Sequence, residues 1–279
     1  MVFRKILCPV DFSDNSIAVL DHAAELAQRY EALLYLLHVE FVPMNSPVQL
    51  ARYASVSREP SEGRLEQIAA DHLSGVQHQI LIRPGWPGSA IESAARELGV
   101  DLIVIATEGW MSLDHPLGNV AQHVVRASKC PVLSFGFRTK LKTLNRILCP
   151  VEFDPDSVRA MKFAARLAEE YRSTLILLHV LPAEASQVSP SRPSSSESEQ
   201  ETRIRLGKIA EENLGSAAKC ELQWRSGDPA QAILDAETEL RTDLIVMATH
   251  GRTGLSYLFL GSVALSIVRD STVPVLTLH

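Results

Sequence analysis

The segment Arg4–Phe12 reads Arg-Lys-Ile-Leu-Cys-Pro-Val-Asp-Phe, and 141 residues later the segment Asn145–Phe153 reads Asn-Arg-Ile-Leu-Cys-Pro-Val-Glu-Phe. Two further runs return in the same order: Leu36–Val39 as Leu177–Val180, and Asp101–Thr107 as Asp243–Thr249. The offset between the copies changes by only one residue across these runs. Solenoid repeats are only about 20–50 residues long, so the pattern indicates that one whole domain is written twice.

Length and composition agree with this duplication. The 279 residues suit two domains of about 140 residues each, and 46% hydrophobic with 22% charged residues is typical of a globular protein. The net charge of −6, with no run of Lys and Arg, argues against nucleic-acid binding. No apolar run approaches the ~20 residues of a membrane span, and the N-terminus does not read as a signal peptide. The four cysteines include no CxxC pair and predict no disulfide framework. We expect a soluble, cytoplasmic protein without a membrane partner.

Within each half, short apolar runs alternate with helical patterns. The strands expected in the second half are 146–151, 174–180, 218–225, 243–249 and 273–278. Val158, Met161, Ala165 and Ala168 form the apolar stripe of a helix, preceded by capping residues from Asp154 to Ser157. Strand–helix alternation with strands that are apolar at consecutive positions predicts an α/β fold. We expect two tandem five-stranded parallel α/β sandwich domains, at residues 1–138 and 145–279.

Two segments interrupt the regular pattern. Residues 137–144 read as a short connector between the halves. The serine- and proline-rich segment 185–200 reads as a loop after the second strand, because so few apolar groups cannot offset the entropy of ordering it. A role as a phosphorylation target is the alternative for this segment.

The most informative chemistry follows the fourth strand of the second half. Ligands of open parallel sheets bind beyond the carboxyl ends of the strands, where this loop begins. Gly251 and Gly254 allow a turn that closely approaches a phosphate, and Arg252 adds a positive charge. Gly261-Ser262 is expected to open the last helix, whose N-terminus favours an anion. The spacing alone supports equally a tight connection without a ligand.

This block resembles the universal stress protein signature G-x2-G-x9-G-[S/T], read here as Ala248-x2-Gly251-x9-Gly261-Ser262. The resemblance extends over nearly the whole chain, through the opening Ile-Leu-Cys-Pro-Val, the Leu-Leu-His-Val run and the Gly227-Asp228-Pro229 turn. It implies a Rossmann-like fold of the adenine nucleotide alpha hydrolase-like type. It also implies that the halves form an intramolecular pseudo-dimer through their last strands, and it leaves open whether tandem chains pair again as homodimers.

The resemblance further implies that ATP, with or without Mg²⁺, lies in the second half. Adenine and ribose would lie near Pro150, Glu152, Val180 and Met247, and the phosphates against Gly251, Arg252, Gly261, Ser262 and Val263. The sequence departs from the family at two of these positions. Ala248 replaces the first signature glycine, so its methyl group crowds the ribose or the first phosphate. Glu152 replaces the usual Asp and is one methylene longer.

The first half departs further from the signature. The gap between its two glycines is eight residues, Asn119 replaces Ser or Thr, and no arginine stands in the place of Arg252. Glu108 and Asp114 add negative charge where phosphates would lie. Asp11 keeps the family carboxylate. We expect the first half not to bind ATP strongly and to serve as a structural partner.

Other candidate sites carry less weight. Cys8 with His38, and Cys149 with His179, end neighbouring strands, which suggests a metal or redox role; two ligands make a poor zinc site, so buried cysteines are favoured. Asp228, in a turn before a helix, reads as an N-cap rather than a catalytic group.

Three functional hypotheses follow. The first is an ATP-binding stress-response or signalling module, without strong catalytic activity, read by an unknown protein partner. The second is an interaction scaffold that needs no nucleotide. The third, a slow ATPase, ranks last, because the chain has neither G-x4-G-K-[S/T] nor G-x-S-x-G.

Overall fold

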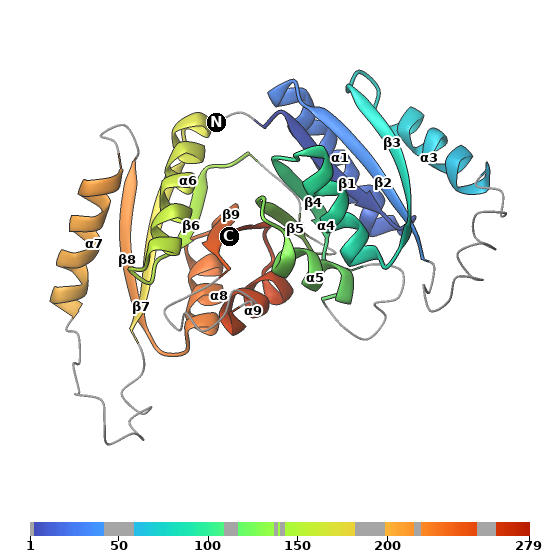
Figure 1. The fold of residues 1–279 in the computed structure, drawn as a ribbon. Coiled ribbons are helices and arrows are strands. Elements are labelled where there is room, and N and C mark those ends of the chain that lie inside the picture. Colours follow the sequence, from blue (N-terminus) through green and yellow to red (C-terminus); the bar gives the residue numbers. More distant parts are fainter. Residues whose placement is uncertain are drawn as a thin grey trace. The chain divides into compact units, whose positions relative to one another are not determined.

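The structure is a computed structural model that describes residues 3–41, 59–108, 117–136, 139, 143–181, 199–214, 219–249 and 261–279. The chain divides into two compact units, Val2–Lys140 and Leu141–His279. Each unit alternates strands and helices (Figure 1).

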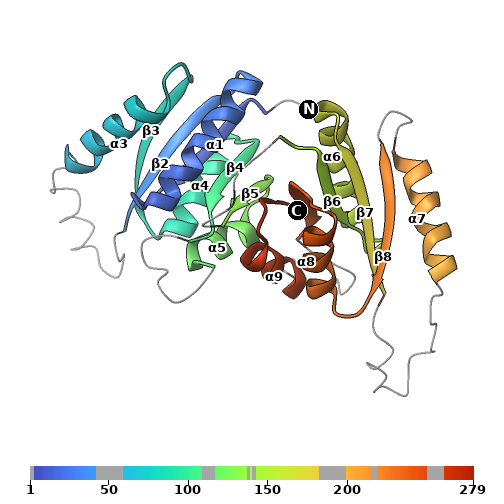
Figure 2. The same ribbon diagram turned by 180° about the vertical axis from the view of Figure 1, so that it is seen from behind.

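The first unit contains five parallel strands in the spatial order β3-β2-β1-β4-β5. Its elements are β1 (Lys5–Val10), α1 (Asp14–Tyr30), β2 (Leu33–Phe41), α3 (Glu59–His72), β3 (His78–Gly85), α4 (Pro87–Leu98), β4 (Leu102–Ala106), α5 (Asn119–Ala127) and β5 (Val132–Phe135). Helices α1 and α3 contact each other on one face of the sheet, and α4 and α5 contact each other on the other (Figures 1 and 2).

The second unit repeats this topology, with the order β8-β7-β6-β9-β10 and parallel pairing. Its elements are β6 (Arg146–Pro150), α6 (Pro155–Tyr171), β7 (Thr174–Leu181), α7 (Glu199–Asn213), β8 (Cys220–Ser226), α8 (Pro229–Glu239), β9 (Leu244–Ala248), α9 (Ser262–Asp270) and β10 (Val275–Leu278). The prediction of two tandem five-stranded parallel α/β domains is confirmed. The pseudo-dimer stays a prediction.

Apolar side chains at consecutive positions place each central strand between two helical layers. Leu34, Leu36 and Leu37 of β2 are fully buried, as are Leu175, Ile176 and Leu177 of β7. Strands that are buried on both faces read as unbroken apolar runs, which is why the sequence pattern identified them. Among the described residues, no helix has the length and apolar character needed to cross a membrane.

An aspartate fastens the start of the first strand in each unit. Asp101 Oδ2 accepts hydrogen bonds from the backbone N–H groups of Arg4 and Lys5, both at 2.9 Å. Asp243 Oδ2 accepts from Asn145 and Arg146 at 2.8 and 3.0 Å. Each carboxylate thus joins parts of the chain nearly 100 residues apart. It fixes the start of the central strand, β1 or β6, beside the start of the neighbouring strand, β4 or β9.

Candidate functional site

Strand order brings five of the predicted residues to one edge of the second sheet: Pro150, Glu152, Val180, Met247 and Ala248. β6 lies between β7 and β9, with Pro150 opposite Leu178 and Leu148 opposite Ile245. Carried forward along β9, this register places Met247 level with Pro150. The chain leaves β6 toward β7 on one side and returns as β9 on the other, and such a switch point is where ligands of open α/β sheets bind.

The residues at this edge are accessible to different degrees. Pro150, Glu152, Val180 and Ala248 are half-buried, whereas the Met247 side chain is only 6% exposed. The edge therefore offers apolar surface and one carboxylate, the combination that a base and a ribose require.

The N-terminus of α9 lies beside the end of β9. The Gly261 N–H donates to the Thr249 carbonyl oxygen at 2.9 Å, and Gly261 is the N-cap of α9. No side chain caps this helix, so its first-turn amides are directed beyond the helix end. A Cβ on Gly261 would lie 3.4 Å from the Thr249 oxygen, an ordinary van der Waals contact, so this position has room for a side chain. With the helix dipole, this end can hold an anion.

Ser262 and Val263, the first residues of α9, are exposed and half-buried respectively. Two predicted phosphate ligands, Gly251 and Arg252, lie outside the described residues. The structure therefore brings together the predicted adenine, ribose and helix-terminal residues of the second half, and it does not describe the loop between β9 and α9.

The first unit has the same backbone arrangement. The Gly118 N–H donates to the Thr107 carbonyl oxygen at 2.7 Å, and Gly118 begins α5 as an N-cap without a side-chain bond. Half-buried Glu108 follows Thr107, and Asp114 lies outside the described residues. At these positions the two units differ in side chains rather than in backbone.

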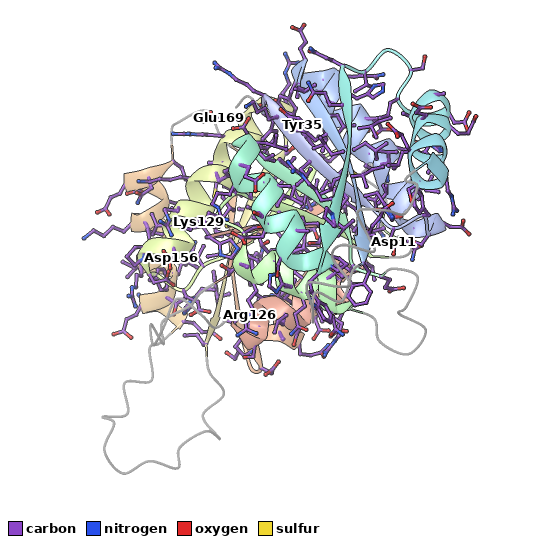
Figure 3. All side chains as sticks on the ribbon, turned by 45° about the vertical axis from the view of Figure 1, so that its right-hand side comes forward. Asp11, Tyr35, Arg126, Lys129, Asp156 and Glu169 are labelled. Atoms are coloured by element: carbon purple, nitrogen blue, oxygen red, sulfur yellow. The ribbon has the colours of Figure 1, made fainter. Side chains whose placement is uncertain are left out.

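The family carboxylates have different neighbours in the two units. Asp11, beyond the end of β1 (Figure 3), accepts from the Ser13 N–H at 3.0 Å and from the Ser13 hydroxyl at 2.5 Å. Asp154 occupies the place of Ser13 in the second unit and caps α6, accepting from the N–H groups of Asp156 and Ser157. An ionised carboxylate only accepts hydrogen bonds. The Asp154 side chain therefore cannot hold Glu152 as Ser13 holds Asp11.

A phenylalanine with a left-handed backbone follows each carboxylate. Phe12 has φ 66° and Phe153 has φ 62°, a region that costs a side-chain-bearing residue about 1–2 kcal/mol. The Phe153 ring lies 4.5 Å from the His179 ring and 4.1 Å from the Arg205 guanidinium. We call these three residues the His179–Phe153–Arg205 cluster. Its counterpart is formed by His38, Phe12 and Arg64, at 4.2 and 4.4 Å.

Neither cluster was predicted from the sequence, although Arg64 and Arg205 share the 141-residue offset that aligns the phenylalanines and the histidines. Each histidine donates its Nδ1 proton to a carbonyl at the end of the first strand: His38 to Val10 at 2.8 Å and His179 to Val151 at 2.6 Å. A carbonyl oxygen cannot donate, so Nδ1 carries the proton.

The two cysteines on the first strands of the units lie in the core rather than at a ligand site. Cys8 and Cys149 are fully buried, and burial raises the pKa of both thiols far above the ordinary value. The strand register places Cys8 opposite Leu36, while His38 lies opposite Val10. Within the described ranges, no group of three or more His, Cys, Asp or Glu side chains is arranged to hold a metal. Asp228 accepts from the Gln231 N–H at 3.0 Å and caps α8, as predicted.

Comparison with known proteins agrees with the duplicated architecture. The model of the universal stress protein family matches residues 2–135 and again residues 143–279. The chain belongs to the universal stress protein family. A universal stress protein of Mycolicibacterium smegmatis is 26% identical over 296 residues, covering 98% of this chain and 96% of that protein. One from Methanocaldococcus jannaschii is 30% identical over 161 residues, covering 55% of this chain and 92% of its own length.

Solved members of the family share the fold. The crystal structure of a universal stress protein from Archaeoglobus fulgidus has a TM-score of 0.74 at 21% identity, covering 99% of this chain and 97% of that one. At that identity the likeness concerns the fold alone. Another solved universal stress protein is a complex with cAMP; it is 22% identical, covers 47% of this chain and 95% of that one, and has a TM-score of 0.34.

Proposed function

We propose that this chain is an ATP-binding stress-response or signalling module whose second half, residues 145–279, holds the nucleotide. The observation that carries the proposal is the uncapped N-terminus of α9, held beside the end of β9 by the 2.9 Å bond from Gly261 to Thr249. Amides that are directed out of a helix end, next to a sheet switch point, favour a phosphate ester.

Each predicted site residue of the second half has a role in this proposal. Pro150, Val180 and Met247 contact the adenine, the Glu152 carboxylate accepts from a ribose hydroxyl, and Ala248 lies near the first phosphate. The phosphates are surrounded by Gly251, Arg252, Gly261, Ser262 and Val263. Backbone N–H groups, a hydroxyl and a guanidinium there offset the net negative charge of the ATP–Mg²⁺ complex. The first half, residues 1–138, acts as a structural partner.

The expected mechanism is linkage between nucleotide and stability. A ligand that binds only the folded state stabilises it by about 2.7 kcal/mol at a concentration of one hundred times Kd. The nucleotide thereby favours one conformation of the second half, which a protein partner can read.

Calorimetric titration of nucleotide-stripped protein with ATP and Mg²⁺ tests the proposal. One ATP per chain, with thermal stabilisation that rises with ATP concentration, supports it. Two ATP per chain would show that the first half binds as well, and no heat at any concentration would refute nucleotide binding. Titration with cAMP, present in one solved relative, then defines which phosphate arrangement the site prefers.

A scaffold that needs no nucleotide is the second candidate, favoured by an exposed aromatic pair in the first unit. Phe41, at the end of β2, is 55% exposed, and Trp86, after β3, is 57% exposed, with the ring centroids 4.7 Å apart. Trp86 is the N-cap of α4 without a side-chain cap bond, where the second unit has the capping Asp228. Exposed aromatic residues are frequent anchors of protein interfaces. Capture of a partner that is lost in Trp86→Ala but unaffected by ATP would support this candidate.

A further inference from the structure

Strand β3 forms one edge of the first sheet, with α3 alongside it (Figures 1 and 2). It pairs with β2, and the Gln77 carbonyl just before it accepts from the Leu34 N–H at 2.9 Å. A parallel ladder uses every second residue of each strand, so the backbone N–H and C=O groups of His78, Ile80 and Ile82 are directed away from β2. Among the described strands, none pairs with this side of β3. The edge therefore offers a row of backbone donors and acceptors to a further strand.

The middle of this edge strand is apolar at three consecutive positions. Ile80, Leu81 and Ile82 are each half-buried. Edge strands are commonly protected from pairing by charged side chains or by proline, which has no N–H to donate. Proline protects this edge only from Pro84 onward, beyond the apolar stretch. Residues 80–82 therefore keep the backbone and the side chains that an added strand requires.

A hollow of about 230 Å³ lies between this strand and α3, lined by Ile80, Ile82, Glu62 and Glu66. The two isoleucines occupy alternate positions of the strand and share the face toward α3, and the two glutamates are four residues apart and share one face of the helix. Small-molecule pockets usually have roughly 300–1,000 Å³, so the hollow suits side chains of a partner better than a free cofactor. Its walls combine apolar surface with two carboxylates.

No cation of the first unit neutralises these two carboxylates. Within the described part of the chain, neither Glu62 nor Glu66 has a side-chain hydrogen bond or an ion pair. Arg64, on the same helix, lies over the Phe12 ring at 4.4 Å. Arg83, on β3, binds a glutamate of α4 at 3.3 Å, on the other face of the sheet. The hollow therefore favours a positive charge that a partner supplies.

The second unit lacks this combination at its own edge strand, β8. The 141-residue offset puts Arg203 and Gly207 in the places of Glu62 and Glu66. A Cβ on Gly207 would lie 4.0 Å from Leu222 Cδ1, so this helix position is directed toward the edge strand in the second unit as well. The acidic hollow is thus particular to the first unit, which has no ligand in the proposed function.

We infer that β3 is a docking site for an extended segment of a partner protein in which lysine or arginine alternates with apolar residues. The segment adds a strand through the outward backbone groups of Ile80 and Ile82. Its basic side chains lie on the α3 face, with aliphatic stems on the isoleucines and cations at Glu62 and Glu66. Its apolar side chains lie on the opposite face, beside Leu81.

A second copy of the chain suits this edge less well. Antiparallel pairing of two β3 strands around Leu81 keeps both α3 helices on the same face of the joined sheets. Such a pairing brings four unpaired carboxylates, Glu62 and Glu66 of each copy, to one junction, where like charges repel. A basic segment replaces this repulsion with attraction.

Fluorescence anisotropy tests the inference with the full chain and a labelled, capped peptide of nine alternating lysine and valine residues. We expect saturable binding that the double variant Glu62→Lys with Glu66→Lys weakens about 10-fold or more, because two attractive charge pairs become repulsive. The control is Glu211→Lys with Glu212→Lys, which changes the net charge equally at two exposed positions of α7 and should keep the Kd within about 2-fold.

Amide hydrogen exchange distinguishes strand addition from adhesion to an acidic surface. The peptide should slow exchange at the outward amides of Ile80 and Ile82. Ile80→Pro removes one outward N–H and no bond to β2, a change that edge strands tolerate, and it should weaken peptide binding about 10-fold. Leu222→Pro, the matched change in β8, should leave the Kd for the peptide unaltered.

Three outcomes would overturn the inference. The first is no binding at millimolar peptide. The second is binding that Ile80→Pro leaves unchanged, without slowed exchange at residues 80 and 82, which would show attraction to the acidic surface alone. The third is a dimer of the peptide-free chain that Ile80→Pro abolishes, which would assign the edge to a second copy. None of these variants alters a proposed nucleotide ligand, so the proposed function stands or fails separately by titration with ATP.

Discussion

The first unit bonds its carboxylate, Asp11, to a serine, and the second unit has an aspartate in the place of that serine. Asp11 is bonded to Ser13, whereas Glu152 lies between Val151 and Phe153 and has the acceptor Asp154 in the place of the serine. Elsewhere the units agree closely: in strand order, in the aspartates that fasten β1 and β6, and in the glycines that begin α5 and α9. The comparison shows that duplication preserved the framework, while the chemistry of the two edges diverged through a few side chains.

Matched substitutions at the two helix-opening glycines give the largest expected difference. Gly118 and Gly261 have nearly equal backbone angles, with φ −66° and −58°, so aspartate can cap either helix. A carboxylate about 4 Å from a phosphate costs about 4 kcal/mol near a protein surface, so Gly261→Asp should weaken ATP binding on the order of 1,000-fold. Gly118→Asp should leave the Kd unchanged. Calorimetry measures both, and equal losses would place nucleotide in both units.

Cysteine labelling should show how similar the two frameworks are. Each unit has one fully buried cysteine and one half-buried cysteine. Burial, with a smaller contribution from Asp101, raises the pKa of Cys130 to about 11; burial, with a smaller contribution from Glu221, raises the pKa of Cys220 to about 11. At pH 8 the thiolate fraction is then roughly 100-fold below that of an ordinary cysteine.

We therefore expect iodoacetamide to modify Cys130 and Cys220 at rates that rise about tenfold per pH unit toward pH 11, with Cys8 and Cys149 reacting only after unfolding. The Cys130 and Cys220 thiols ionise near pH 8.5 in the unfolded chain but only near pH 11 in the folded protein. Their contribution to the free energy of unfolding is therefore fully present below pH 8.5 and is lost as the pH rises toward 11. Peptide mass spectrometry measures the rates. Fast labelling of one unit alone at pH 8 would contradict the equivalence of the frameworks.

Removal of the fastening aspartates tests the same equivalence by stability. Asp101→Ala and Asp243→Ala each deprive two backbone N–H groups of a charged acceptor, so we expect each to lower the free energy of unfolding by about 2 kcal/mol. Urea denaturation measures the change. The exposed Asp235→Ala serves as control, with an expected change under about 0.5 kcal/mol. A loss confined to one variant would mean that the two first strands are anchored differently.

The smallest expected effect concerns the residue that ends β9. Ala248→Gly restores the first signature glycine and removes the methyl group beside the proposed phosphate site, so we expect the Kd for ATP to fall about 2- to 4-fold, an effect below ~1 kcal/mol. Ala106→Gly, the matched change in β4, should leave the Kd unaltered. Calorimetry distinguishes the two, and an equal response would remove Ala248 from the site.

The sequence predicted most of the framework because buried strands and helix faces show a local pattern of apolar residues. The strand expected at residues 243–249 is Leu244–Ala248, and the one expected at 174–180 is Thr174–Leu181. Asp154 and Asp228 cap their helices as their positions indicated. Strand ends differ by one or two residues, as at Cys220–Ser226, because pairing with the neighbouring strand rather than local apolarity decides where a strand stops.

The candidate site was only partly predictable. Glycine spacing predicted the start of α9 at Ser262, since a helix terminus is a local feature. The His179–Phe153–Arg205 cluster joins residues from β7, α7 and the turn after β6, and no periodicity relates residues so far apart in the chain. The hydrogen bond from the Thr272 N–H to Glu237 Oε1, 2.9 Å long and without an equivalent acceptor at Ala95 of the first unit, is also a product of tertiary packing.

The pairing of β1 with β4 also has a consequence for how the protein is made. Ile6 pairs with Leu102, so at about 5–20 residues per second a ribosome supplies the partner of β1 roughly 5–20 s after β1. Leu102–Ala106 and Leu244–Ala248 differ at one position, Ile105 against Met247, so either strand suits β1 or β6. Synthesis completes β4 and β5 before β6 emerges. β1 can therefore pair with β4 before the similar strand β9 has been made. Refolding from denaturant offers both strands at once, and we expect exchanged pairings only there.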